Sequence, residues 1–117
     1  YWRLAEPGKN CISTCADHGM VCTENQFHKH IDKVDTDEKV QILMSAFGTP
    51  CKRFNNRYGT NTDVPNLGSD GTCFVSASTR SLSNIKCSRE GANNGRRLCL
   101  CSGNFHSLVS CSVSDTN

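Results

Sequence analysis

The sequence has few aromatic residues and no long apolar run. Phe, Trp and Tyr together make up only 7% of its 117 residues, so the folded chain can bury only a modest apolar core and cross-links are expected to supplement it. No stretch approaches the ~18 apolar residues of a membrane-spanning helix, which predicts no membrane span. The net charge of +2 is too small to indicate nucleic-acid binding.

Motifs that mark common catalytic and metal sites are also missing. The chain contains no Gly-x-Ser-x-Gly nucleophile turn, no His-Glu-x-x-His zinc helix and no Asp-x-Asp-x-Asp-Gly calcium loop. His28 and His30 would lie about 200° apart on a helix, whereas a helical zinc pair needs a spacing of four residues. We therefore expect a protein that is not an enzyme and that has no metal site and no cofactor.

Cysteine is the residue type in excess, with nine copies. The Cys11–Cys15 spacing would suit one half of a zinc site, but Cys99 and Cys101 are too close together for a standard second half. Disulfides in an oxidising compartment are therefore favoured over metal, which predicts a secreted or extracellular protein. An odd count leaves one cysteine unpaired within the chain, either free or joined to another chain, and the pairing of the others stays open. The cysteines are Cys11, Cys15, Cys22, Cys51, Cys73, Cys87, Cys99, Cys101 and Cys111.

The close cysteine pairs restrict the possible pairings. Cys11 and Cys15, four residues apart, share one face of a helix, so both should bond to the same neighbouring element. Cys99 and Cys101 share one face of a strand and should bond outward rather than to each other. We expect long-range bridges between the N-terminal and C-terminal thirds. The chain begins at Tyr1 without Met or a signal peptide, which we interpret as a mature or excised domain.

The first half of the sequence predicts three helices. The first begins after Asn10 and ends at Gly19, and the second begins with the capping pair Thr23 and Gln26. The third begins at residue 35 or 36, and Gly48 with Pro50 ends it. Apolar residues spaced for one helix face follow the second and third caps: Phe27, Ile31 and Val34, and then Val40, Leu43, Met44 and Phe47.

The second half predicts a long loop and several strands. Residues 55–71 are rich in Asn, Gly, Thr and Asp, as loops are. Strands are expected at 72–77, 83–88, 96–102 and 108–113, with a hairpin across Asn93-Asn94-Gly95 joining the second and third. Helices followed by strands favour an α+β fold. The expected architecture is a small disulfide-rich single domain over residues 1–117, with N-terminal helices packed on a distorted antiparallel sheet.

Basic residues are concentrated on or beside the expected hairpin. Residues 1–50 contain five Lys/Arg and seven Asp/Glu, whereas residues 51–117 contain eight and four, so the halves carry −2 and +4. Arg binds planar anions through two parallel charge-assisted hydrogen bonds, so such a hairpin could hold an acidic sugar. An ordinary solvated strand face remains the alternative interpretation. The residues concerned are Arg80, Lys86, Arg89, Arg96 and Arg97.

The cysteine pattern, together with a few Gly and Arg positions, resembles a known family. Together with Phe27, two segments are similar to the microneme adhesive repeat, a cysteine-rich module of secreted apicomplexan-parasite adhesins: Pro7-Gly8-Lys9-Asn10-Cys11-x₃-Cys15-x₃-Gly19-Met20-Val21-Cys22 and Arg97-Leu98-Cys99-Leu100-Cys101. The first ~30 residues are also similar to a luminal cysteine-rich region of Golgi N-acetylglucosaminyltransferases.

The adhesive-repeat resemblance implies a cell-adhesion lectin that binds sialylated glycans on host cells during invasion, with neighbouring repeats in the full-length protein. The family's sugar site carries a His-x-Thr motif, which this chain lacks. Its nearest counterpart is His106-Ser107-Leu108, so the candidate ligand-binding residues are His106 and Ser107, with Arg80, Arg96 and Arg97. Two alternatives stay open: a structural or protein-binding repeat of the same fold without sugar affinity, and an accessory domain of a Golgi-type enzyme.

Overall fold

Five short strands form one mixed sheet in the computed structural model, which describes residues 1–103 of the chain. Their spatial order is β1-β5-β3-β4-β2, and every pairing is antiparallel except that of β2 with β4, which is parallel. The expected α+β class is confirmed, with a mixed sheet in place of the antiparallel one. The strands are β1 (Trp2–Leu4), β2 (Arg53–Asn55), β3 (Asn66–Leu67), β4 (Thr72–Phe74) and β5 (Arg96–Leu100).

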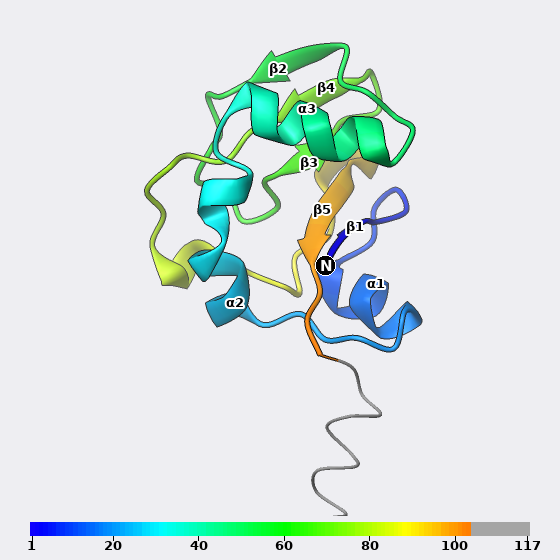
Figure 1. Cartoon of the computed structure of the whole chain (residues 1–117), viewed down its shortest axis with the longest axis vertical. Coiled ribbons are helices and arrows are strands. Elements are labelled where there is room, and N and C mark those ends of the chain that lie inside the picture. The colour runs from blue at the N-terminus through cyan, green and yellow to red at the C-terminus, as the bar shows by residue number, and fades with distance from the viewer. Residues whose placement is uncertain (104–117) are drawn as a thin grey trace, which may run out of the picture.

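The longest strand, β5, connects the two ends of the molecule. It pairs with β1 along one edge, where Trp2 lies opposite Leu100, and with β3 along the other, where Asn66 lies opposite Arg97. Figure 1 shows α1 and β1 beside β5 at one end, and α3 at the end that carries β2, β3 and β4. The sequence patterns did not predict β1, β2 or β3, since strands of two or three residues are too short to show alternation. Strand β3 lies within residues 55–71, which the sequence predicts as a loop.

The three expected helices form, and each begins at a capped residue. Helix α1 (Cys11–Asp17) begins after Asn10, whose side chain accepts from the Ser13 amide (2.8 Å), and Gly19 follows its end with a φ of +69°. Thr23 and Thr36 cap α2 (Glu24–Lys29) and α3 (Asp37–Ala46) in the same way. These side-chain acceptors replace partners that the first helical amides lack.

The second helix is shorter than its apolar spacing indicates. It ends at Lys29, and the chain continues as a 3₁₀ turn over Ile31–Lys33. The ring of His30, rather than its backbone amide, contacts the Gln26 carbonyl oxygen (2.8 Å). The His30 amide donates to the Phe27 carbonyl oxygen, three residues back in the chain. Phe27, Ile31 and Val34 are nevertheless all buried in the core, so the apolar face is used as expected.

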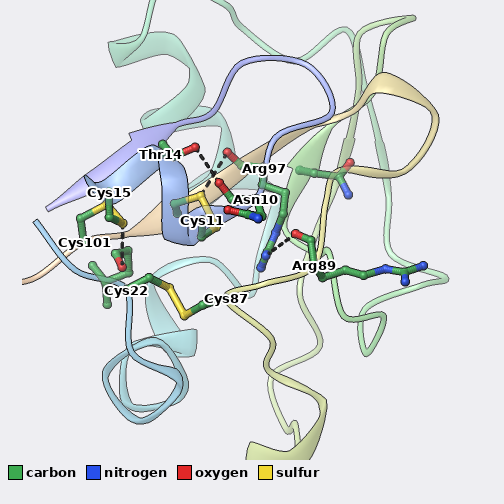
Figure 2. The surroundings of a disulfide bond; sticks show 12 residues. Asn10, Cys11, Thr14, Cys15, Cys22, Cys87, Arg89, Arg97 and Cys101 are labelled. Carbon is green, nitrogen blue, oxygen red and sulfur yellow. Dashed lines mark hydrogen bonds between the residues drawn. A yellow bond between two sulfur atoms is a disulfide. The ribbon is translucent and has the colours of Figure 1, made fainter. Parts of the chain in front are cut away.

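Four disulfides cross-link the fold. Cys11–Cys99 and Cys15–Cys101 both join α1 to β5 or the residue after it (Figure 2), which confirms that each close pair bonds outward to one neighbouring element. Cys22–Cys87 is also long-range, and Cys51–Cys73 closes a span of 22 residues. Such a set is typical of secreted and extracellular proteins. Cys111 lies outside the described residues.

The expected hairpin does not form. Within 83–88 the chain makes a 3₁₀ turn (Leu82–Asn84) and then an irregular segment, and β5 pairs with β1 and β3 instead. Asn93 and Asn94 do have the positive φ values of a tight turn, but no strand precedes them. The physical reason is that Cys87 is bonded to Cys22 and that Arg97 binds the carbonyls on both sides of Cys87, at Lys86 and Arg89. The segment therefore bends over the end of this arginine. The strand expected at 108–113 lies outside the described residues.

Candidate functional site

Two of the arginines expected to bind a ligand lie inside the protein. Arg97 is 1% exposed, and its Nη1 donates to the carbonyl oxygens of Lys86 (2.7 Å) and Arg89 (2.8 Å). Figure 2 shows this guanidinium directed toward the Arg89 backbone while the Arg89 side chain extends away. The Arg97 guanidinium carbon also lies 5.9 Å from the ring centroid of Phe27. A ligand at the surface therefore has no access to Arg97.

Arg80 is buried in the same manner behind a different segment. Its two terminal nitrogens donate to the carbonyl oxygens of Val64 (2.7 Å) and Asn61 (2.7 Å). Burial lowers the pKa of both Arg80 and Arg97 to about 10, an effect that the negative charge of Asp63 opposes. Both side chains therefore remain charged at neutral pH and act as internal supports for two loops.

The other candidate residues are distributed elsewhere. Arg96 is half-buried, and its Nε donates to the carbonyl of Ala5 at 2.9 Å. His106 and Ser107 lie outside the described residues. The structure therefore does not bring Arg80, Arg96 and Arg97 together on a surface, because β5 directs Arg96 and Arg97 to opposite faces and Arg80 belongs to a separate segment.

A broad open cleft lies on the outer side of the loop that Arg97 supports. Its volume is about 1030 Å³, and it lies between the segment that follows β1 and the segment that precedes β5. Three exposed cationic side chains line it, against a single carboxylate at Glu90. We refer to this site as the cationic cleft, and its charged lining residues are Lys9, Lys86, Arg89 and Glu90.

Hydrogen bonds from two other segments hold the backbone that carries these cations. The Cys87 amide donates to Glu24 Oε2 (2.9 Å), and its carbonyl accepts from the Cys11 amide (2.9 Å). Farther along, the Gly91 amide donates to the Lys9 carbonyl (3.3 Å), which joins the two walls of the cleft. A wall that is ordered before binding loses little conformational entropy on binding, which favours affinity.

Close backbone packing also shapes this wall. A Cβ on Gly91 would lie 2.0 Å from the carbonyl oxygen of Gly95, so only glycine fits there. The turn between them places Asn93 and Asn94 at the rim, both exposed and both with positive φ. Their amide side chains add hydrogen-bond donors and acceptors to the cationic lining.

The cationic cleft is therefore suited to anion binding. Lys and Arg side chains at an open, pre-ordered rim can pair with carboxylate, sulfate or phosphate groups. No group of three or more His, Cys, Asp and Glu side chains that could hold a metal ion occurs within residues 1–103. Within that same range, no helix has the length and apolar character needed to cross a membrane.

Sequence patterns identified part of this site. They predict Lys86 and Arg89 among the basic residues near an acidic ligand, whereas Lys9 stands out only as part of the Pro7–Cys22 segment. The signal that the sequence could offer for Lys9 is its position two residues before Cys11, because a disulfide to β5 brings that segment alongside the C-terminal part of the chain.

Comparison with known proteins adds no family assignment. No protein-family model matches the sequence, and no curated protein matches it significantly.

Proposed function

We propose that this chain is an extracellular cell-adhesion module, without enzymatic activity, that binds sialylated or otherwise acidic glycans on host cells. The observation that carries the proposal is the cationic cleft, where Lys9, Lys86 and Arg89 surround an open and pre-ordered surface. The carboxylate of a sialic acid is the kind of anion that such a rim pairs with.

Two further features support this proposal. Four disulfides suit a protein that works outside the cell, and the cysteine pattern resembles the microneme adhesive repeat. An adhesin of that family would be stored in micronemes and would carry neighbouring repeats. An open site with few contacts binds weakly by itself, and several repeats would raise the overall avidity.

A structural or protein-binding repeat without sugar affinity is the second candidate function. The observation that favours it is the absence of a His-x-Thr motif from the sequence. The two functions make opposite predictions for a glycan array probed with the multivalently displayed domain. Binding to sialylated glycans, but not to their desialylated forms, supports the adhesion lectin, and an empty array supports the structural repeat.

The cleft is tested by the double charge reversal Lys86→Glu/Arg89→Glu. Because charge-assisted hydrogen bonds to the anion are lost, we expect affinity for sialosides to fall by about tenfold or more. The fold should be kept, since both side chains are exposed. Titration of the full chain with methyl α-sialoside, monitored by NMR, measures the change, and binding of the original protein should weaken with added salt.

Lys29→Glu/Lys33→Glu is the matched control. Both lysines are exposed and neither lines the cationic cleft, so the same change in net charge should leave affinity unchanged. If both double variants lost the same amount of sialoside affinity, only the overall charge would matter. The cleft would then not be the sugar-binding site. The variant His106→Ala tests the position implied by the family resemblance. If it alone abolishes binding, the sugar site lies beyond residue 103.

A further inference from the structure

A second, smaller depression adjoins the cationic cleft. It measures about 440 Å³, within the range of ~300–1,000 Å³ usual for small-molecule sites, and includes Tyr58, Asn61 and Phe74 in its lining. Ala92 and Asn93 line both depressions. The two hollows are therefore neighbours across one rim. We refer to this second hollow as the aromatic depression.

An aromatic pair forms one side of the depression. Tyr58 is 44% exposed, and its ring centroid lies 6.3 Å from that of Phe74, with an angle of 41° between the planes. The Tyr58 carbonyl accepts from the Asn61 amide (3.0 Å), so the tyrosine belongs to an ordered turn. An exposed ring held in this way offers an apolar face with a partial negative charge, which suits the C–H face of a pyranose.

Polar groups around the ring match the hydroxyls of a sugar. Asn61 is exposed beside Tyr58, and Asn93 stands at the shared rim. The exposed carboxylate of Asp70 also lines the depression, and a hydrogen bond from the Thr72 amide lowers the pKa of Asp70. Sugar hydroxyl groups donate to such an acceptor, whereas it would repel an anionic sugar. The depression therefore favours a neutral sugar, in contrast to the cationic cleft.

Buried arginines support both hollows from behind. Arg97 binds the carbonyls of Lys86 and Arg89 in the wall of the cleft, and Arg80 binds those of Asn61 and Val64 in the wall of the depression. Asp63 Oδ2 accepts from the Ala92 amide (3.0 Å) at the shared rim. The two hollows are thus parts of one ordered surface.

We propose that the cationic cleft and the aromatic depression together bind one oligosaccharide, with an acidic sugar between Lys86 and Arg89 and the neighbouring neutral pyranose stacked on Tyr58. This inference rests on the proposed function, and adds to it that the ligand is an acidic glycan of at least two units. The signs of charge in the two hollows determine the direction in which the glycan lies.

The test compares three probes with the full chain by NMR titration: methyl α-sialoside, lactose and 3′-sialyllactose. We expect sialyllactose to bind on the order of fivefold more tightly than the methyl sialoside, because its galactose unit adds the stacking contact. Tyr58→Ala should reduce sialyllactose affinity to the level of the methyl sialoside without changing affinity for the methyl sialoside itself. Tyr58→Phe should retain the original affinity, because it keeps the ring.

The matched control is Tyr1→Ala, which removes another exposed tyrosine that lies in neither hollow. If Tyr58→Ala leaves the affinity for 3′-sialyllactose as high as in the original protein, the neutral sugar does not stack on Tyr58. That result would overturn this inference and leave the proposed function intact. Two outcomes would overturn the cleft proposal and this inference with it. In the first, neither sialylated probe binds the original protein. In the second, the Lys86→Glu/Arg89→Glu variant binds sialosides as tightly as the original protein.

Discussion

At the scale of single residues, the two buried arginines determine how the loops are held. Each guanidinium donates to the carbonyl oxygens of two loop residues. One side chain thus supplies hydrogen bonds that backbone amides would supply in a regular helix or sheet. Arg suits this role because its planar fork presents several donors in fixed directions. The sequence predicts both Arg80 and Arg97 as ligand-binding residues on or beside a hairpin, whereas the structure buries them. Their carbonyl partners lie between 8 and 19 residues away along the chain, beyond the few residues that a local pattern covers.

Replacement of Arg97 by Met tests this internal support. The variant leaves the carbonyls of Lys86 and Arg89 without their donor and the buried Asp63 with less compensating charge. We expect a loss of about 3 kcal/mol in the free energy of unfolding. Denaturation by guanidinium chloride under non-reducing conditions measures it. Sialoside affinity should also fall, although the side chain does not reach the cleft.

The adjacent residue provides the control for this prediction. Arg96 is half-buried and its Nε makes one hydrogen bond, to the Ala5 carbonyl, so Arg96→Met should cost only about 1 kcal/mol. If the two variants were equally stable, the carbonyl contacts of Arg97 would not hold the loop.

At the scale of elements, helices were easier to predict than strands. The caps at Asn10, Thr23 and Thr36 are local signals, and each marks the start of a helix in the structure. Strands β1 and β3 have no comparable signal, since their conformation comes from pairing with β5. The hairpin expected around residues 83–102 shows that a local signal can also be overruled by distant contacts. Asn93 and Asn94 adopt the expected turn conformation, but a disulfide and a buried arginine bend the segment away from strand pairing.

The cleft loop depends on the Cys22–Cys87 disulfide. Removing it with Cys22→Ala/Cys87→Ala should lower the free energy of unfolding by about 2–4 kcal/mol, mainly because the unfolded chain becomes less restricted. Sialoside affinity should fall as well, because Lys86 and Arg89 flank Cys87 and would lose their fixed positions. Unfolding curves and sialoside titrations of the same variant measure both effects.

The disulfide between Cys51 and Cys73 is the matched comparison. It joins the segment before β2 to β4 and lines neither hollow. Cys51→Ala/Cys73→Ala should therefore destabilise the protein by a similar amount and keep the affinity. If both disulfide variants lost sialoside binding, the cause would be the lower stability of the whole fold. The position of the cleft loop would then not explain the loss.

At the scale of the whole molecule, cross-links connect the two ends of the chain. The bonds from Cys11, Cys15 and Cys22 span 88, 86 and 65 residues along the sequence. They hold the segment that contains Lys9 beside the segments that contain Lys86 and Arg89. The disulfides thus help to bring together cleft cations from the first and the last third of the sequence.

Peptide mapping without reduction tests this arrangement. We expect cross-linked peptides for Cys11–Cys99, Cys15–Cys101, Cys22–Cys87 and Cys51–Cys73. Mass spectrometry of a digest whose cleavages separate the cysteines identifies each pair. An exchanged pairing, with Cys11 bonded to Cys101 and Cys15 to Cys99, would contradict the structure, because it would require α1 to lie in the opposite direction along β5.

Local patterns in the amino-acid sequence are enough to predict the disulfide-rich α+β class, the starts of the three helices and the outward bonding of the close cysteine pairs. These features depend on caps, apolar spacing and residue periodicity, all of which act within a few residues. The burial of Arg80 and Arg97, the meeting of Lys9 with Lys86 and Arg89 in one cleft, and the position of Tyr58 beside that cleft become visible only in the folded molecule. Burial and proximity come from contacts between segments that are not neighbours in the sequence, and no local pattern specifies those contacts.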